Sequence, residues 1–375
     1  MDQPVTTNNV TLSTHSTRND KTRSIDDLPA DVLIAIFKIV HSMSLRYPSA
    51  IDGANNEIFW QDEDLSSLTW FPEALAAVCP SWKDTLSLVS VFWTRLIIFV
   101  DDHPTPSPAI SDHLALSADN HLEIVITRRP GAFPSADPCE KSRVSAVMDV
   151  LTPNISRWKR LFVNVLHHHS IPRPHIDIYG EARHLRHICL QSRLQDALHI
   201  TYYYPKVEQD ESNDGYHTYI VEQAFRRTSQ LQHYDTATRR QVSLDLHAPQ
   251  LAKLHVDGLT FCTTYLSTPR TIARVRELTI SHYGSTYRNQ FKVDQLIRCL
   301  QALPYLQHLM LVDVEIGPSN GNMFPAGDCT MARCTLEDLS SRTLLELRPL
   351  LISPSITKLN FRRCAAPPWR GGPLV

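Results

Sequence analysis

The sequence predicts an α+β protein with a small helical module near its N-terminus, followed by a curved array of strand–helix repeats. Three observations predict this fold: an amphipathic helical pattern near the N-terminus, a strand motif that occurs six times, and helical patterns between its copies. Hydrophobic residues make up 42% of the 375 residues, which is typical of a chain that folds over most of its length. An α/β domain with a parallel sheet is the alternative.

Ordered structure is expected to begin after residue 23. Residues 1–23 contain too little apolar surface to offset the entropy of ordering, so they are predicted to be a disordered tail. An amphipathic helix is predicted next, with Pro29 in its first turn and Asp26 or Asp27 as its cap. Its apolar residues recur at helical spacing: Val32, Leu33, Ile36, Phe37 and Val40.

The helical module is expected to span residues 24–100 and to contain a long polar loop over 41–71. The helical pattern then resumes. Pro80 must begin a new helix, because proline lacks an amide donor and clashes with a preceding helical turn. Two short helices are therefore predicted to meet there, followed by a buried strand over Leu96 to Val100.

Residues 101–115 begin with a proline-rich stretch and are predicted to be a linker to an array that spans 116–375. The array is recognised by the motif apolar-x-x-apolar-x-apolar. Its copies begin at Trp158, Leu185, Leu251, Val275, Leu306 and Ile356. Their first positions are separated by 27, 66, 24, 31 and 50 residues. The short gaps lie at or near the period of leucine-rich repeats, roughly 20–29 residues, and the long gaps are interpreted as two or three periods.

Helical patterns lie between these motifs. One apolar face consists of Leu296, Ile297, Leu300 and Leu303, and a second consists of Leu344, Leu345, Leu347 and Leu351. Strands and helices that alternate at this period bury their apolar faces only by stacking on their neighbours. Leu122 to Ile126 is a candidate first strand, and the polar block Thr201 to Tyr216 is predicted to be an inserted loop.

Charge and cysteine content narrow the class of protein. Lys and Arg number 37 against 39 Asp and Glu, a net charge of −2, so neither nucleic acid nor a membrane is expected as a partner. None of the eight cysteines forms a C-x-x-C pair, and the N-terminus lacks the apolar core of a secretory signal. A reduced cytoplasmic or nuclear protein is expected.

No catalytic, cofactor or metal site is expected. Histidines cluster at 167–169, with His175, His184 and His187 nearby, but adjacent histidines on a strand point to opposite faces and rarely converge on one ion. Cys329 and Cys334 lack a second pair and are interpreted as a loop with two free thiols. Nucleophile-elbow, dinucleotide-binding and P-loop motifs do not occur, so a non-catalytic protein is predicted.

Three stretches resemble an F-box domain. They are Leu28-Pro29-Ala30-Asp31-Val32-Leu33-x-x-Ile36-Phe37, then Leu75-x-x-Val78-Cys79-Pro80-Ser81-Trp82-Lys83, and finally Trp93-Thr94-Arg95-Leu96. The segment between Val40 and Pro72 is longer than in the compact family pattern. With an acidic loop there and irregular leucine repeats after it, the chain is similar to the large F-box families of mushroom-forming fungi.

The resemblance implies a substrate-recognition adaptor of a cullin-RING ubiquitin ligase. The F-box would dock on the Skp-type adaptor of that ligase, and the repeats would bind an unknown target protein. The residues that match family positions used for docking or for the module's small core are Leu28, Pro29, Ile36, Val78 and Trp82. The alternative function is a leucine-repeat scaffold unrelated to ubiquitination, with the N-terminal helices as a cap.

Overall fold

The computed structural model describes residues 25, 28–44, 71–129, 136–194, 233–234, 241–242, 246–266, 269–284, 292–318 and 329–365. The tail predicted for 1–23 and the loop predicted for Thr201 to Tyr216 lie outside these residues, as do the proposed caps Asp26 and Asp27. Only the two ends of the loop predicted for 41–71 are described, and helix α1 continues into its first part.

Short helices form the N-terminal part of the structure. They are α1 (Ala30–Ser44), α3 (Glu73–Ala76), α4 (Pro80–Ser87) and the 3₁₀-helix η2 (Ser90–Trp93). The carbonyl of Pro29 accepts the first amide bonds of α1, from Val32 and Leu33. Pro80 is the first residue of α4 and follows an extended Cys79, so the predicted junction of two short helices is confirmed.

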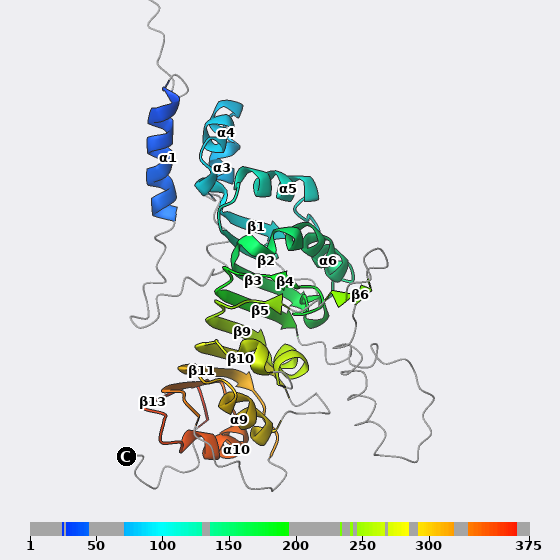
Figure 1. Cartoon of the computed structure of the whole chain (residues 1–375), viewed down its shortest axis with the longest axis vertical. Helices are drawn as coiled ribbons and strands as arrows, with labels where there is room; N and C mark the ends of the chain where they lie inside the picture. The colour runs from blue at the N-terminus through cyan, green and yellow to red at the C-terminus, as the bar shows by residue number, and fades with distance from the viewer. Residues whose placement is uncertain are drawn as a thin grey trace, which may run out of the picture.

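The rest of the described chain is built on one sheet of nine parallel strands (Figure 1). They are β1 (Arg95–Phe99), β2 (Leu122–Thr127), β3 (Trp158–His167), β5 (His187–Leu194), β9 (Lys253–Asp257), β10 (Glu277–Tyr283), β11 (His308–Val314), β12 (Arg333–Glu337) and β13 (Lys358–Arg362). Their order in the sheet follows their order in the chain and never reverses. A doubly wound α/β sheet, by contrast, reverses its order at a switch point.

The helices of this part lie on one side of the sheet (Figure 1). They are α5 (Ser107–Leu116), α6 (Glu140–Leu151), α9 (Val293–Gln301) and α10 (Ser341–Leu351). Shorter helices complete this side: η3 (Thr152–Arg157), η4 (His168–Ser170), α8 (Gly258–Thr260), the π-helix η6 (Phe261–Tyr265) and η7 (Pro269–Ile272). Two small pairs lie outside the main sheet, β4 (Gly180–Glu181) with β8 (Leu246–His247) and β6 (His233–Tyr234) with β7 (Gln241–Val242).

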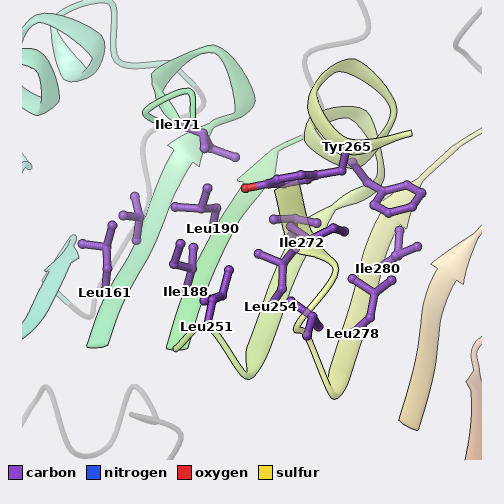
Figure 2. Packing of buried hydrophobic residues seen from close by; sticks show 14 of the residues in the cluster. Leu161, Ile171, Ile188, Leu190, Leu251, Leu254, Tyr265, Ile272, Leu278 and Ile280 are labelled. Carbon is purple, nitrogen blue, oxygen red and sulfur yellow. The ribbon is translucent and has the colours of Figure 1, made fainter. Parts of the chain in front are cut away.

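The strand motif explains why one face of the sheet packs against the helices. Its second and third apolar positions are two residues apart, so both side chains point to the same face of a strand. In β11 these residues are Leu309 and Leu311, which are both buried and pack with α9 residues such as Leu296 and Leu300 in one continuous core. Figure 2 shows the equivalent pairs of β5 and β10 on either side of Leu254 of β9 in this core.

The structure differs from the prediction at the start of the array. Strand β1, expected to belong to the helical module, is the first strand of the sheet, and α5 occupies most of the stretch 101–115 that was expected to be a linker. The prolines there begin a helix: Pro106 is extended, and Pro108 lies in the first turn of α5. Ile110 and Leu114 of α5 are buried in the sheet's core.

The two long gaps have different causes. Between Leu306 and Ile356 a further motif begins at Met331, 25 residues from each, and forms β12. Its second apolar position is Cys334, which lies buried in β12, so the prediction of a loop is wrong for this cysteine. Across the 66-residue gap, β5 pairs directly with β9, so the gap is a single insertion between neighbouring strands and not two or three periods.

Two further details concern the C-terminal part. The helix predicted near Leu344 is confirmed as α10, but Leu345 is exposed, and Leu350 lies in the buried face instead.

Left-handed backbone conformations, uncommon outside glycine, occur at equivalent positions at or just after the ends of four successive strands: His282, Asp313, Asp338 and Arg363. The chain therefore leaves these four strands by the same backbone turn.

Candidate protein-binding surfaces

The N-terminal helices have a small core of their own, separate from the core under the sheet. Its buried members are Leu33, Phe37, Phe71, Leu86, Phe92 and Trp93. The rings of Phe37 and Trp82 meet edge to face with centroids 5.2 Å apart, and those of Phe71 and Phe92 do so at 5.0 Å. The indole nitrogen of Trp93 donates to the carbonyl of Leu86 at 3.1 Å. These contacts hold α1 and α4 together as one unit, the helical module.

Helix α1 is apolar on two sides, and only one of them is covered. Leu33 and Phe37 face the small core. A second row of large apolar side chains is exposed, and we call it the α1 stripe: Val32, Ile36, Ile39 and Met43. The spacings of four, three and four residues place them on one line along the helix. Ile39 and Met43 are 61% and 62% exposed, values unusual for such side chains when they have no partner.

Exposed apolar side chains are concentrated in this module. Nine of the fifteen large apolar side chains that are exposed in the described residues lie between Ile25 and Val91. Besides the α1 stripe they are Ile25, Leu28, Val78, Leu88 and Val91. A concentration of this kind marks a surface that contacts another molecule, whereas single exposed apolar residues are ordinary.

The structure places the five predicted docking residues in two environments. Leu28, Pro29, Ile36 and Val78 are exposed, and Ile36 lies within the α1 stripe. Trp82 is partly buried against the small core, where its indole nitrogen has no hydrogen-bond partner among the described residues. Motif reasoning did not single out Ile39 or Met43, although their spacing from Ile36 marks the same helix face.

The helical module is attached to the first strand and helix of the array. The Trp93 and His113 rings lie 5.3 Å apart, and His113 of α5 is 3.3 Å from a carboxylate oxygen of Glu73. Arg95 of β1 donates from Nη1 to the carbonyl of Ser44, the last residue of α1, at 3.2 Å. The module therefore rests on the end of the array through these contacts and through Leu116 of α5, which packs against the small core.

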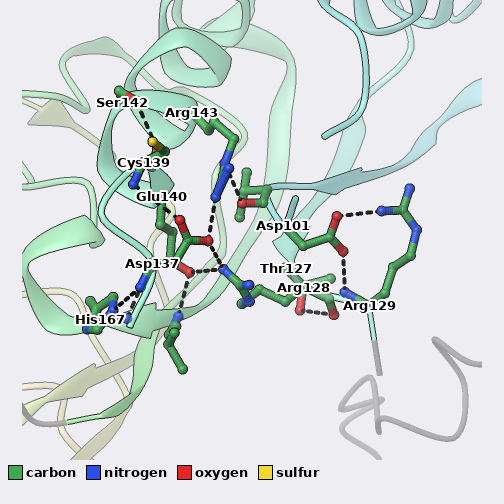
Figure 3. A network of polar contacts seen from close by, with 12 residues as sticks. Asp101, Thr127, Arg128, Arg129, Asp137, Cys139, Glu140, Ser142, Arg143 and His167 are labelled. Carbon is green, nitrogen blue, oxygen red and sulfur yellow. Dashed lines mark hydrogen bonds and ion pairs between the residues drawn. The ribbon is translucent and has the colours of Figure 1, made fainter. Parts of the chain in front are cut away.

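A buried network of charges lies where β2 and β3 end (Figure 3). Arg128 Nη1 donates to Asp137 Oδ2 at 2.6 Å and to Glu140 Oε1 at 3.1 Å, and Arg143 also pairs with Asp137. Glu140 accepts the backbone amides of Leu166 and His167. Burial acts to raise the pKa of Asp137, but the hydrogen bonds from Arg143 and Arg128 outweigh it and lower the pKa to about 2. The network connects α6 to the sheet. Its charges are paired and hydrogen-bonded, as in a network that stabilises a fold.

The clustered histidines contact different polar partners, although the rings of His167 and His169 stack with centroids 5.1 Å apart. His167 Nε2 accepts the amide of Asp137, His168 Nε2 lies 3.1 Å from Asp257, and His175 Nδ1 accepts the amide of Leu246. The ring of His184 stacks on His121 instead. Within the described ranges, no three His, Cys, Asp or Glu side chains are grouped as a metal site.

A polar cavity of about 300 Å³ lies near the start of β2 and of β5. It is lined by Asp119, His121, Ser156, Arg157, Glu181, Arg183 and His184. Small-molecule sites usually have hydrophobic or aromatic anchors beside a few placed polar groups, and this lining contains no aliphatic, Phe, Tyr or Trp side chain. The α1 stripe is therefore a stronger candidate for a functional surface than the cavity.

None of the helices in the described part of the chain is long and apolar enough to span a lipid bilayer. No protein-family model, no curated protein and no solved structure matches the chain.

Proposed function

We propose that this chain is the substrate-recognition adaptor of a cullin-RING ubiquitin ligase. The helical module docks as an F-box on the Skp-type adaptor, and the array, built as irregular leucine-rich repeats, binds the protein to be ubiquitinated. Neither step needs a catalytic or cofactor site in this chain. The adaptor acts by tethering its target, which raises the target's effective concentration at the catalytic subunits. Such a complex would be cytoplasmic, nuclear or both.

The single observation on which the docking proposal depends is the α1 stripe. A helix whose second apolar face is exposed fits a groove on a partner protein, with anchors at helical spacing. Burial of one such side chain contributes about 1.5–3 kcal/mol. Ile36, Ile39 and Met43 are exposed and are the anchors that such a groove would bury.

Two features of the array support its half of the proposal. The strand order is strictly sequential, and the helices lie on one side, so each unit contacts mainly its neighbours, as in a solenoid. The left-handed residue that recurs near the ends of β10, β11, β12 and β13 is typical of a structural repeat. An array of this form presents an extended open face for a protein partner.

Capture by a purified Skp-type adaptor tests the docking surface. Ile36→Asp/Ile39→Asp places charges in the centre of the α1 stripe and is expected to weaken capture by more than about tenfold, because a charge cannot be buried unpaired in an apolar interface. Ile352→Asp is the matched control, because Ile352 is 66% exposed and lies at the end of α10, far from the module. Circular dichroism checks that the variants keep their helices. A wild-type chain that does not bind the adaptor contradicts the proposal.

One observation favours the second candidate function, a protein-binding scaffold with the helical module as its cap. The module contacts the first strand and α5 through Arg95, Trp93 and His113, where a solenoid needs a polar-faced terminal unit. If the module is a cap, its unfolding should also unfold the array. If it is a docking module, the array should stay folded, and hydrogen exchange of the Phe37→Ala variant distinguishes the two cases.

A further inference from the structure

The sheet face opposite the helices contains a row of ionisable side chains that crosses all nine strands. The strand register aligns one residue from each strand: Arg95, Glu123, Arg160, His187, Lys253, Glu277, His308, Arg333 and Lys358. We call it the open-face row. Each of these residues directly precedes a strand residue that packs in the core, so its own side chain points to the opposite face. Neighbours in the row are separated by the strand spacing of about 4.8 Å.

Positive charge predominates in the open-face row, with five Arg or Lys against two Glu. Glu123 lies within ion-pair distance of Arg95, Lys159 and Arg160, at 3.8, 3.3 and 3.7 Å. Glu277 pairs with Lys253 at 3.0 Å. Both carboxylates of the row are therefore already compensated.

Most of the excess positive charge lies at the C-terminal end of the row. No carboxylate follows Glu277 in it, and Arg333 and Lys358 have no ion pair among the described residues. In the next row of this face, Thr335 and Asn360 supply a hydroxyl and an amide, and the amide of Asn360 lies 3.5 Å from the hydroxyl of Thr335. This end of the sheet thus combines uncompensated cations with neutral hydrogen-bonding groups.

The histidines of this face do not add positive charge near neutral pH. Burial, together with Arg160, lowers the pKa of His187 to about 4. Burial also lowers the pKa of His308, and the cations Arg333 and Lys253 lower it further. The positive field at this end therefore comes from Arg and Lys and does not change with pH in the physiological range.

We propose that the C-terminal end of the open-face row binds an acidic peptide segment of the target protein, with its carboxylates held by Arg333 and Lys358. This inference rests on the part of the proposed function in which the array binds a target, and it does not depend on docking to the Skp-type adaptor. An acidic peptide fits better than a nucleic acid, whose interfaces are much more uniformly basic. Glu123, Glu277 and Glu337 lie among the cations of this face and would repel a continuous phosphate backbone.

Fluorescence anisotropy of a labelled oligoglutamate peptide with the full-length chain tests the proposal. The variant Arg333→Glu/Lys358→Glu reverses the two uncompensated charges and is expected to weaken binding by about tenfold or more. The matched control is Arg342→Glu/Arg348→Glu, which changes the net charge equally through exposed side chains of α10 on the helical side of the sheet. The control is expected to change binding by less than about twofold, and wild-type binding should weaken as salt rises.

Three results would overturn the proposal: no binding of the peptide by the wild-type chain, equal weakening in both double variants, or tighter binding of a labelled single-stranded oligonucleotide of equal charge. An oligolysine peptide is the control for the sign of the peptide's charge and is expected not to bind. The same variants test the α1 stripe and the open-face row independently of each other. Arg333→Glu/Lys358→Glu should keep capture by the Skp-type adaptor, and Ile36→Asp/Ile39→Asp should keep peptide binding.

Discussion

Gly258 lies directly against Tyr283, so closely that a β-carbon on Gly258 would come within 2.3 Å of the Tyr283 Cβ. Gly258 is the first residue of α8, and Tyr283 lies at the end of the neighbouring strand β10. Gly258 is buried, and the Tyr283 side chain lies in the core under the sheet. The close contact sets how near α8 can approach the sheet, and no other residue type fits at position 258 without displacing Tyr283.

Gly258→Ala is therefore expected to destabilise the array. The added methyl group must displace a buried aromatic residue, and overpacking of this kind costs about 1–3 kcal/mol. Urea unfolding of the wild type and the variant measures the change in unfolding free energy. Both curves are fitted with the same dependence of free energy on urea concentration. An unfolding midpoint equal to that of the wild type would contradict the contact.

Phe37→Ala is expected to loosen the helical module and to leave the array folded. Phe37 is buried against Trp82 in a core that is separate from the one under the sheet, and removal of such a ring costs about 3–5 kcal/mol. Hydrogen exchange should increase in α1 and α4 and stay unchanged in β9 to β12. Ile39→Ala, on the exposed α1 stripe, is the control and should leave exchange nearly unchanged.

Increased hydrogen exchange in the array of the Phe37→Ala variant would support the other candidate function. If Phe37→Ala also increased exchange in the strands of the array, the module would unfold together with the sheet. That outcome would favour the cap function over an autonomous docking module.

The stability contributed by Asp137 is expected to depend on pH in the acid range. Its pKa is lowered in the folded chain from about 3.8 to about 2, so the deprotonated form is stabilised by folding. The contribution is fully present above the unfolded pKa and is lost as the pH falls through the folded value. The difference in unfolding free energy between wild type and Asp137→Asn should therefore shrink as the pH falls from about 4 to about 2. A difference that is constant over this range would contradict the ion pairs with Arg128 and Arg143.

Thiol labelling should separate the cysteines by burial. Burial raises the pKa of Cys189, Cys299 and Cys334 to about 12, so these thiols stay protonated near neutral pH and are shielded from solvent. Cys139 is exposed and should react first with a maleimide, as followed by mass spectrometry of peptides. The three buried thiols should react only after urea unfolds the chain. Rapid native labelling of Cys334 would contradict its place in the core.

Much of the sheet could be predicted from the sequence, because the strand motif directly encodes which face of a strand is apolar. The motif failed at β12, where Cys334 occupies the second apolar position, which the other motifs fill with Leu or Ile. A buried thiol behaves as a small hydrophobe, so the pattern was present but weaker. Proline misled the prediction at α5, because Pro108 lies in the first turn of a helix, where a proline costs nothing.

The candidate surfaces could be predicted only in part. Helical periodicity identified α1, but periodicity alone does not tell which of two apolar faces is covered. Ile36 was selected by resemblance to a family, and its neighbours Ile39 and Met43 became evident only from their exposure. Trp82 could be placed in the core or at an interface from sequence alone, and the structure packs its ring against Phe37.

The sequence by itself determined the elements: an amphipathic first helix, a helix that must begin at Pro80, and strands with one apolar face. These follow from local stereochemistry and from periodicity, which act within a few residues. Only the tertiary structure decided the open-face row, because its members are 24 or more residues apart in the chain and are aligned by the register of parallel strands. Tertiary packing also decided that Leu33 and Phe37 are covered while Ile36 and Ile39 are exposed, since burial depends on which element lies opposite and not on the residue alone.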